Sequence, residues 1–557
     1  MMAQEKQFLK SQEQYETLCK LMRQAERDGL RMDEIEGHLM PGLMLLGRRF
    51  LEEHVAAQGD GDVGPQVSSD DETLRRSQKP HQRRYLSIFG EVTIMRFVYL
   101  PREGQKAEYI PLDACLGLPA GENSYLLEEW QQRFCVKDAF GESVRDLKAI
   151  LGTGVSVRTA EDMNRRMAEY VPAYGQSQPA PAPDEEEELL VVTADGKGVV
   201  MRRPFEEELH EHLENLASAN AAADTCDATL PVEPAPPELR GKRQQPRSGR
   251  RARQAQRREA EDARRKHARN ASSRHADGTK QRKSKKQMAY VGAVYTIARF
   301  RRTTDDVLDE MARSARAKDR PQPQHKRVWA EMTRILHGEP CSGREWLFCS
   351  LAWQCQQRDA RREKTLICLL DGEHSLWDMQ RYWFKRAVGI LDIFHVSERV
   401  WEVAHCFHKR GGDAARSFAT HHLRMILDGK VRYVVRNFRS KLSEAKLSKE
   451  KRETIQAAIT YFQNNSDHMH YDQYLAAGYP IGSGVAEGAC RHLVKDRMEL
   501  TGMRWERPGA QAMLHLRAVY LNGDWNNFVK FRIQTEQSRL YGPDTIYAQI
   551  SSYAQAA

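Results

Sequence analysis

Two aspartates in this sequence each stand between an apolar run and a glycine, in VVTADGKG at Asp195 and in ICLLDGEH at Asp371. We expect both runs to be buried β-strands that end at the aspartate, so that neighbouring strand ends bring the two carboxylates together. Ionised carboxylates repel each other unless a cation neutralises them, which predicts a Mg²⁺ or Mn²⁺ site. Taken singly, an Asp-Gly pair at a strand end is more simply explained as the start of a turn.

A third carboxylate, Glu487, lies in the stretch YPIGSGVAEGACRHLVKDRM over residues 479–498. The Gly-Ser-Gly turn predicts the start of a helix with Glu487 in its first turn, where a carboxylate also interacts favourably with the helix dipole. Arg491 and Lys495 recur on roughly the same helical face, and we expect Arg497 to be exposed as well. Cations beside a metal-bound carboxylate are suited to a passing phosphodiester backbone.

The elements that must position these residues follow from the hydrophobic pattern. An alternating run over residues 85–100 turns at Gly90 and predicts a β-hairpin. Four further apolar runs predict strands, at 189–201, 288–300, 365–377 and 387–396.

Residues 140–170 show a helical pattern, a Gly-Thr-Gly break and a second helical pattern that carries Arg158, Arg165 and Arg166. Two helices joined by a short turn, with arginines on the second, are compatible with a helix-turn-helix that reads DNA. A plain helical hairpin packed into a core explains the same pattern equally well.

The net charge of +9 is unevenly distributed over the 557 residues. Residues 240–286 hold 19 Lys or Arg against 4 Asp or Glu, which predicts an arm that binds a polyanion. The surrounding segment 204–287 has little apolar surface to bury, and we expect it to be disordered. The start of the chain lacks a signal core, and no run reaches the roughly 18 apolar residues of a membrane span, so we expect a cytoplasmic, nucleoid-associated protein.

Several longer stretches together resemble the ISKra group of bacterial insertion-sequence transposases. These are VVTADGKGVVMRRP, YVGAVYTIARF, ICLLDGEHSLW, ILDIFHVSERVWEVAHCFH and AAGYPIGSGVAEGACRHLVKDRMELTGMRW with GAQAMLHLRAVYLNGDW after it, and they span roughly 82–200 and 288–545. The resemblance implies a DDE transposase with an RNase H-like catalytic fold. It also implies that Asp195, Asp371 and Glu487 are the acidic triad that holds two Mg²⁺ ions, or Mn²⁺.

The stretch DIFH is similar to the D-x-x-H signature of the wider Mutator-like transposases. It places Asp392 and His395 on the strand after the second acid, where they would support the triad. Four more residues are candidates for DNA contact: Lys326 and Arg327 at an expected helix start after a Pro-rich bend, and Arg504 and Trp505 in GMRW. Trp505 would stack on an unpaired base, or else pack in the core.

The expected architecture is an α/β RNase H-like catalytic domain with an all-α insertion, behind a mainly helical DNA-binding region that contains a β-hairpin. We expect the parts to be a helical segment at 1–60, the hairpin and helix-turn-helix at 82–175, the catalytic core at 188–203 and 288–400, the all-α insertion at 401–478, and the Glu487 helix with the C-terminal helices at 479–545. A Pro-rich acidic linker at 176–188 is expected to separate the two halves.

The expected function is metal-dependent strand cleavage and strand transfer at the ends of an insertion sequence. The expected partners are double-stranded DNA, as terminal inverted repeats and as target, and further copies of the chain in a homo-oligomer on that DNA; no membrane is expected. The alternatives are a nuclease with the same triad and no strand transfer, and a DNA-binding regulator or domesticated nuclease derived from a transposase.

Overall fold

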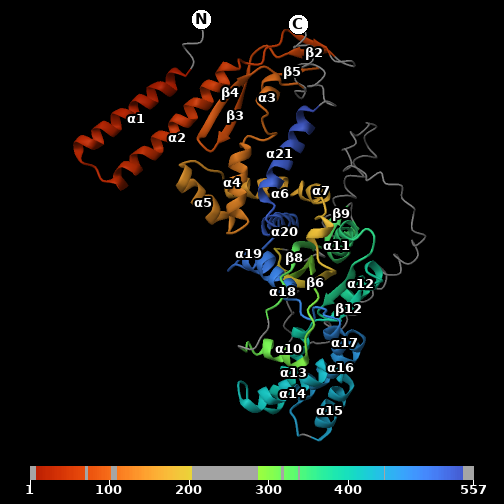
Figure 1. Ribbon diagram of the computed structural model, residues 1–557. Helices are drawn as coiled ribbons and strands as arrows, with labels where there is room; N and C mark the ends of the chain where they lie inside the picture. Colours follow the sequence, from red (N-terminus) through yellow and green to blue (C-terminus); the bar gives the residue numbers. More distant parts are fainter. Residues whose placement is uncertain are drawn as a thin grey trace, which may run out of the picture. The chain divides into compact units, whose positions relative to one another are not determined.

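A computed structural model describes residues 8–68, 73–101, 109–202, 286–314, 319–336, 339–444 and 446–542 of the chain. Over these residues the protein is a mixed α/β structure (Figure 1). Its contacts divide it into two units, of which the first comprises Met1–Met201, Gln287–Arg334 and Pro340–Ala557. The segment 204–287, which we expect to be disordered and which holds the basic run, lies almost wholly outside the described residues.

A five-stranded mixed sheet in the order β12-β11-β6-β7-β8 forms the centre of the first unit. Strands β6, β11 and β12 run parallel, and β7 and β8 are antiparallel. The first six residues of β6 and the last five of β11 are buried, as expected of parallel strands covered on both faces. The strands are β6 (Leu189–Val200), β7 (Lys286–Ile297), β8 (Gln324–Met332), β11 (Thr365–Leu370) and β12 (Val388–Leu391).

Helices cover this sheet and continue beyond β12. The segment after that strand is helical as far as the Gly-Ser-Gly turn, and its helices pack on one another through a core shared with the sheet (Figure 1). The helices are α10 (Thr304–Met311), α11 (Gly343–Arg358), α12 (His374–Trp383), α13 (Ile393–Phe407), α14 (Asp413–Leu427), α15 (Val431–Glu444), α16 (Lys449–Asn464) and α17 (Tyr471–Ala476). Two short strands, β9 (Arg334–Leu336) and β10 (Glu339–Cys341), lie between β8 and α11.

The chain begins with two long helices, α1 (Leu9–Asp28) and α2 (Met32–Ala57), which pack against each other. The predicted hairpin is present as β3 (His81–Ser87) and β4 (Gly90–Arg96). Gly90 has a φ of +112°, a conformation that favours glycine at the tight turn between these strands. Strands β1 (Gln66–Ser68), β2 (Thr73–Arg76) and β5 (Tyr99–Leu100) form a small sheet, and α3 (Pro111–Cys115) follows.

A second core joins helices from both ends of the chain to the sheet strands β7 and β8. Two buried arginines stabilise it, because they bind the carbonyl groups at the end of α4: Arg497 Nε donates to Cys135 at 2.7 Å, and Arg517 donates to Val136. The helices are α4 (Tyr125–Cys135), α5 (Phe140–Leu151), α6 (Val157–Ala168), α7 (Val171–Ser177), α20 (Arg507–Leu521) and α21 (Trp525–Tyr541).

Three sequence predictions differ from this fold. The Pro-rich stretch 176–188 does not separate two compact units, because the helices before it share a core with α20 and α21. The fourth predicted strand ends early, since β12 stops at Leu391 and α13 follows. Residues 324–332 form strand β8 rather than a helix start, because they pair with β7 along the edge of the sheet. Within the described ranges, no helix is long and apolar enough to cross a bilayer.

Candidate active site

Asp195 and Asp371 lie side by side at one edge of the sheet. Strands β6 and β11 are parallel with Leu370 opposite Ala194, so the next residue of each strand is one of the two aspartates. Asp371 follows the last residue of β11, as predicted. Strand β6 instead continues to Val200, so Asp195 lies within its strand, one residue beyond its last pairing with β11.

The two carboxylates interact electrostatically. Partial burial raises the pKa of Asp371, a hydrogen bond from the Glu373 amide (2.9 Å) lowers it, and the negative charge of Asp195 raises it again. The net pKa of Asp371 lies above its ordinary value. On the other side, Asp195 Oδ1 accepts a 2.6 Å hydrogen bond from the Gly196 amide. The edge therefore holds two close negative charges with few donors to offset them.

The glycine after Asp371 is required by its surroundings. Gly372 has a φ of +91°, and a Cβ atom there would lie 2.8 Å from Leu391 and 2.9 Å from the Tyr461 hydroxyl. That hydroxyl donates a 2.7 Å hydrogen bond to the backbone carbonyl of Asp371. Helix α16 thus holds the strand end in place, which gives the Asp-Gly pair a structural role beside any chemical one.

Asp392 anchors the Gly-Ser-Gly turn. It is buried at the end of β12, where it caps α13 by accepting from the Phe394 amide at 2.8 Å. Its other oxygen accepts from the Ser483 amide at 3.1 Å and from the Ser483 hydroxyl. Burial raises the pKa of Asp392, and these hydrogen bonds lower it again in part. Asp392 therefore fixes the turn that precedes Glu487, a role that its position beyond a strand did not reveal.

His395 lies in the first turn of α13 rather than on a strand. Its Nδ1 is 3.5 Å from Glu398, and its side chain is partly exposed. A positive charge on His395 lowers the pKa of both Asp371 and Asp392, so the ring lies near both carboxylates. The supporting role of the D-x-x-H stretch stays a prediction.

Glu487 lies in α18 (Gly484–Ala489), a helix that begins at the anchored turn and packs against β6. Its side chain is exposed. The residue of this helical face that contacts Asp195 is Cys490, whose thiol pKa is raised by burial and by the Asp195 carboxylate. Over the described ranges, no group of three or more His, Cys, Asp or Glu side chains is close enough to hold a metal ion. The structure thus brings Asp195 and Asp371 together. Glu487 lies one helical turn before Cys490, the residue that contacts Asp195, and its own side chain is exposed.

The helix after Glu487 is irregular. Residues Cys490–Lys495 form a π-helix, η3, between α18 and the short helix α19 (Asp496–Met498). Such insertions are rare and are frequent at functional sites. Glu499, which follows this region, lies 3.8 Å from Lys197, two residues from Asp195 on the same face of β6. Glu499 is therefore a carboxylate near this end of β6 and an alternative to Glu487 as the third acid of the site.

The predicted DNA contacts on this helix divide into two groups. Arg491, Lys495 and Arg504 are exposed. Arg497 is fully buried, contrary to our expectation, because its guanidinium binds the end of α4 and stacks over an aromatic ring of Trp505 at 5.0 Å. Trp505 is buried too, and its indole N–H donates to the Met498 carbonyl. Core packing, rather than base stacking, is its role in this structure.

The arginines of the expected helix-turn-helix are paired within the fold. Arg165 lies 2.6 Å from Asp162, and Arg166 lies 3.0 Å from the buried Glu128, whereas Arg158 is exposed. Helix α6 buries its other face against α4 and α20. This packing favours the helical hairpin, and DNA reading by α6 stays a prediction.

The last predicted pair of DNA contacts lies on strand β8. Lys326 is exposed, whereas Arg327 forms an ion pair of 2.7 Å with Asp524 at the start of α21. Arg327 thus joins the sheet to the C-terminal helices.

Comparison with known proteins adds no identification: no protein-family model matches the chain, and no curated protein is significantly similar to it.

Proposed function

We propose that this protein is a DDE-type DNA transposase with an RNase H-like catalytic core, which cleaves and joins strands at the ends of an insertion sequence. The observation that carries the proposal is the pair of aspartates on adjacent parallel strands, Asp195 and Asp371, beside a helix that starts at an anchored turn and bears Glu487. The resemblance to ISKra transposases implies that these three residues form the acidic triad, and the two neighbouring aspartates support that proposal.

The residues at this edge fit divalent cations. Asp195 and Asp371 offer hard oxygen ligands. Burial and then the charge of Asp195 raise the pKa of Asp371, and a bound cation would offset both effects. Two Mg²⁺ or Mn²⁺ ions would be held by these aspartates and Glu487, and such ions supply the activation of water and of a 3′-hydroxyl for attack on phosphorus. Glu487 reaches them if α18 shifts toward β6.

The remaining residues of the site would hold the DNA strand. Arg491 and Lys495 are exposed on the helix that carries Glu487, and Lys197 lies on the same strand face as Asp195. Their charges favour a phosphodiester near the two carboxylates, where an unassisted polyanion would be repelled. His395 is partly exposed and lies close to Asp371, where its ring could donate a hydrogen bond to a bound phosphate.

A second candidate function is a DNA-binding regulator derived from a transposase. The observation that favours it is the exposed Glu487, which is not gathered with the two aspartates. Inspection of the DNA on either side of the gene separates the two, because a mobile element requires terminal inverted repeats. A nuclease without strand transfer is separated by its failure to join a cleaved end to target DNA.

The direct experiment is Mg²⁺-dependent nicking of a labelled terminal-repeat DNA by the purified full chain. Asp195→Asn, Asp371→Asn and Glu487→Gln should each lower nicking by orders of magnitude while DNA binding stays intact, since a two-metal site needs every carboxylate. Glu450→Gln is the matched control, because Glu450 is an exposed glutamate in the first turn of α16, whereas Glu506 is, like Glu499, an alternative candidate for the third ligand. If Glu499→Gln is inactive and Glu487→Gln retains near wild-type nicking, the third ligand is Glu499.

A further inference from the structure

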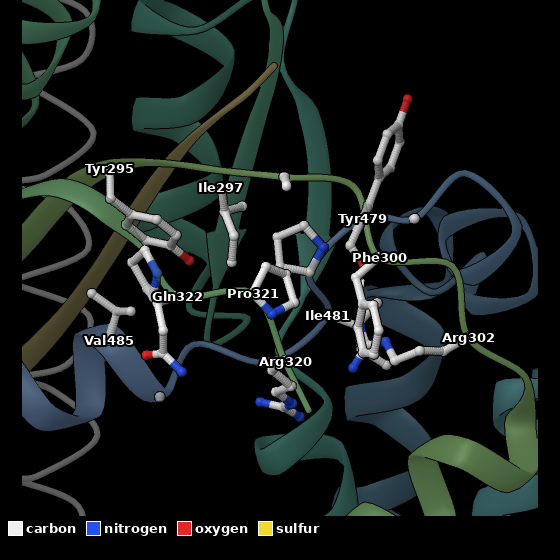
Figure 2. Close-up of a pocket in the computed structure, with 16 residues that line it drawn as sticks. Tyr295, Ile297, Phe300, Arg302, Arg320, Pro321, Gln322, Tyr479, Ile481 and Val485 are labelled. Atoms are coloured by element: carbon white, nitrogen blue, oxygen red, sulfur yellow. Dashed lines mark hydrogen bonds between the residues drawn. The ribbon is translucent and has the colours of Figure 1, made fainter. Parts of the chain in front are cut away.

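A cavity of about 300 Å³ lies beside the candidate active site, between the loop after β7, the loop before β8 and the Gly-Ser-Gly turn. Its wall is largely apolar and aromatic. Figure 2 shows Tyr295 and Val485 on one side of the view, Phe300 and Ile481 on the other, and Pro321 between them. A volume of this size is typical of small-molecule sites. None of these residues entered the sequence-based prediction of the site.

Two arginines give the cavity a positive charge. Arg302 is 6% exposed; it lies 3.3 Å from Glu310 and donates to the Tyr479 carbonyl at 3.3 Å. Its Nε atom is buried and has no hydrogen-bond partner among the residues that the structure describes. Arg320 binds the same Glu310 carboxylate. The two guanidinium groups thus share the Glu310 carboxylate, and Asp306 is a further negative charge near Arg302.

Burial lowers the pKa of Arg302, and the charge of Asp306 raises it in part. Burial and the like charge of Arg302 lower the pKa of Arg320, so the two guanidinium groups repel each other. Both arginines also line a second cavity of about 310 Å³ on the far side of Ile481. An anion placed between them would relieve their repulsion and supply an acceptor for the unpartnered Nε. Arginine pairs of this kind suit phosphate, which accepts several hydrogen bonds at once.

We propose that this cavity binds a nucleotide, with the base between Phe300 and the apolar wall and the phosphate at Arg302 and Arg320. The combination of an aromatic slot, a phosphate-sized positive site and one side-chain amide, that of Gln322, matches the way proteins hold a nucleotide taken out of a duplex. If the protein is the proposed transposase, the nucleotide that occupies the cavity is an unpaired nucleotide of the DNA next to the cut.

The cavity is connected to the candidate active site through the turn. Gly482 and Gly484 line it, and Ser483 between them is held by Asp392. The hydroxyl of Tyr295 lies near enough to Asp392 and Arg320 for both charges to affect its pKa, which burial raises. A nucleotide in the cavity therefore contacts the loop from which α18 and Glu487 start.

The first test measures binding of deoxynucleoside 5′-monophosphates, the matching nucleosides and inorganic phosphate to the full chain by titration calorimetry without metal. We expect the monophosphates to bind more tightly than either part alone. Arg320→Gln should weaken monophosphate binding at least roughly tenfold, because it removes a charge-assisted hydrogen bond. Arg301→Gln is the matched control, since Arg301 is an exposed neighbour that does not line the cavity.

The second test distinguishes a nucleotide of the DNA from a free nucleotide. A duplex with one unpaired 2-aminopurine nucleotide at its end should change fluorescence on binding, and a mononucleotide should compete this change away. Phe300→Ala, with folding checked by circular dichroism, should abolish the fluorescence change and keep affinity for the fully paired duplex.

Equal binding of nucleosides and monophosphates, or wild-type binding of monophosphates by Arg320→Gln, overturns the proposed nucleotide site. Binding of monophosphates with no 2-aminopurine response overturns the DNA assignment. Loss of nicking alone bears on the proposed function and leaves this result unaffected.

Discussion

Replacing Asp195 with asparagine should stabilise the metal-free protein at neutral pH. The carboxylate of Asp195 raises the pKa of Asp371, so the pair destabilises the fold whenever both groups are ionised. Asparagine removes the charge and keeps an oxygen that can accept the 2.6 Å hydrogen bond from the Gly196 amide. The variant therefore loses repulsion and little else. Residues that serve chemistry at a cost in stability commonly behave in this way.

The magnitude follows from the geometry. Adjacent strands lie about 4.8 Å apart. Two unit charges about 5 Å apart interact by roughly 3 kcal/mol at an effective dielectric constant of about 20. Both aspartates are only partly buried, and solvent screening reduces this to about 1–2 kcal/mol. Because the entropy of unfolding grows with the number of residues, each kcal/mol raises the melting temperature by only roughly 1 °C in a unit as large as the first one.

The pH dependence fixes the sign. An ordinary aspartate has a pKa of about 3.9, and the folded pKa of Asp371 lies higher. The folded state therefore holds its proton to higher pH than the unfolded state does, and wild-type stability falls as pH rises through this window. The gain from Asp195→Asn should be absent below the ordinary pKa and complete above the raised one.

The assay is thermal melting of both proteins with EDTA and with Mg²⁺, at pH values on either side of that window. Mg²⁺ should raise the wild-type melting temperature more than that of the variant, because bound ligand stabilises only the state that holds it. Glu487→Gln is the control without metal, since its exposed side chain should leave the melting temperature unchanged. A variant that melts below wild type at pH 7, or gains equally at pH 3, would refute the repulsion argument.

Two further changes test the Gly-Ser-Gly turn and the basic segment 240–286. Ser483→Ala removes the hydroxyl that donates to buried Asp392; unfolding should become easier by about 1–3 kcal/mol, hydrogen exchange at the turn should rise, and nicking should fall while DNA binding persists. Unchanged exchange at the turn would show that Asp392 does not anchor it. Deleting residues 240–286, which lie outside the described structure apart from Lys286, removes a net charge of +15 and should weaken binding to random duplex and flatten its salt dependence. Equal salt slopes before and after the deletion would assign the arm another role.

The part of the site that sequence reasoning could predict is local. An apolar run followed by Asp-Gly indicates a buried strand and its end, and parallel pairing then places Asp371 beside Asp195. The mixed α/β character and the β-hairpin at Gly90 follow from hydrophobic periodicity and turn chemistry in the same way. The RNase H-like identity of the sheet stays a prediction.

What could not be predicted depends on contacts between distant segments. Arg497 belongs by spacing to a basic helical face, yet it is buried because it binds carbonyl groups of α4, more than three hundred residues earlier in the chain. Residues 324–332 follow a Pro-rich bend that suggests a helix start, but pairing with β7 makes them a strand. Local propensity is overridden in both cases by a partner that the sequence alone does not reveal.

The structure explains the first glycine of the Gly-Ser-Gly turn, Gly482, whereas a Cβ atom at Gly484 would meet nothing within 4 Å. A Cβ atom at Gly482 would lie 2.7 Å from the ring of Phe394, so only glycine lets the turn approach α13 closely enough for Ser483 to reach Asp392. The same approach opens the cavity on the other side of the turn. Helix α18 starts where these constraints meet, and its first turn bears Glu487. The turn is held by Asp392 at Ser483 and by the Ile393 amide at the Ile481 carbonyl, so a ligand in the cavity contacts the segment that fixes where α18 and Glu487 begin.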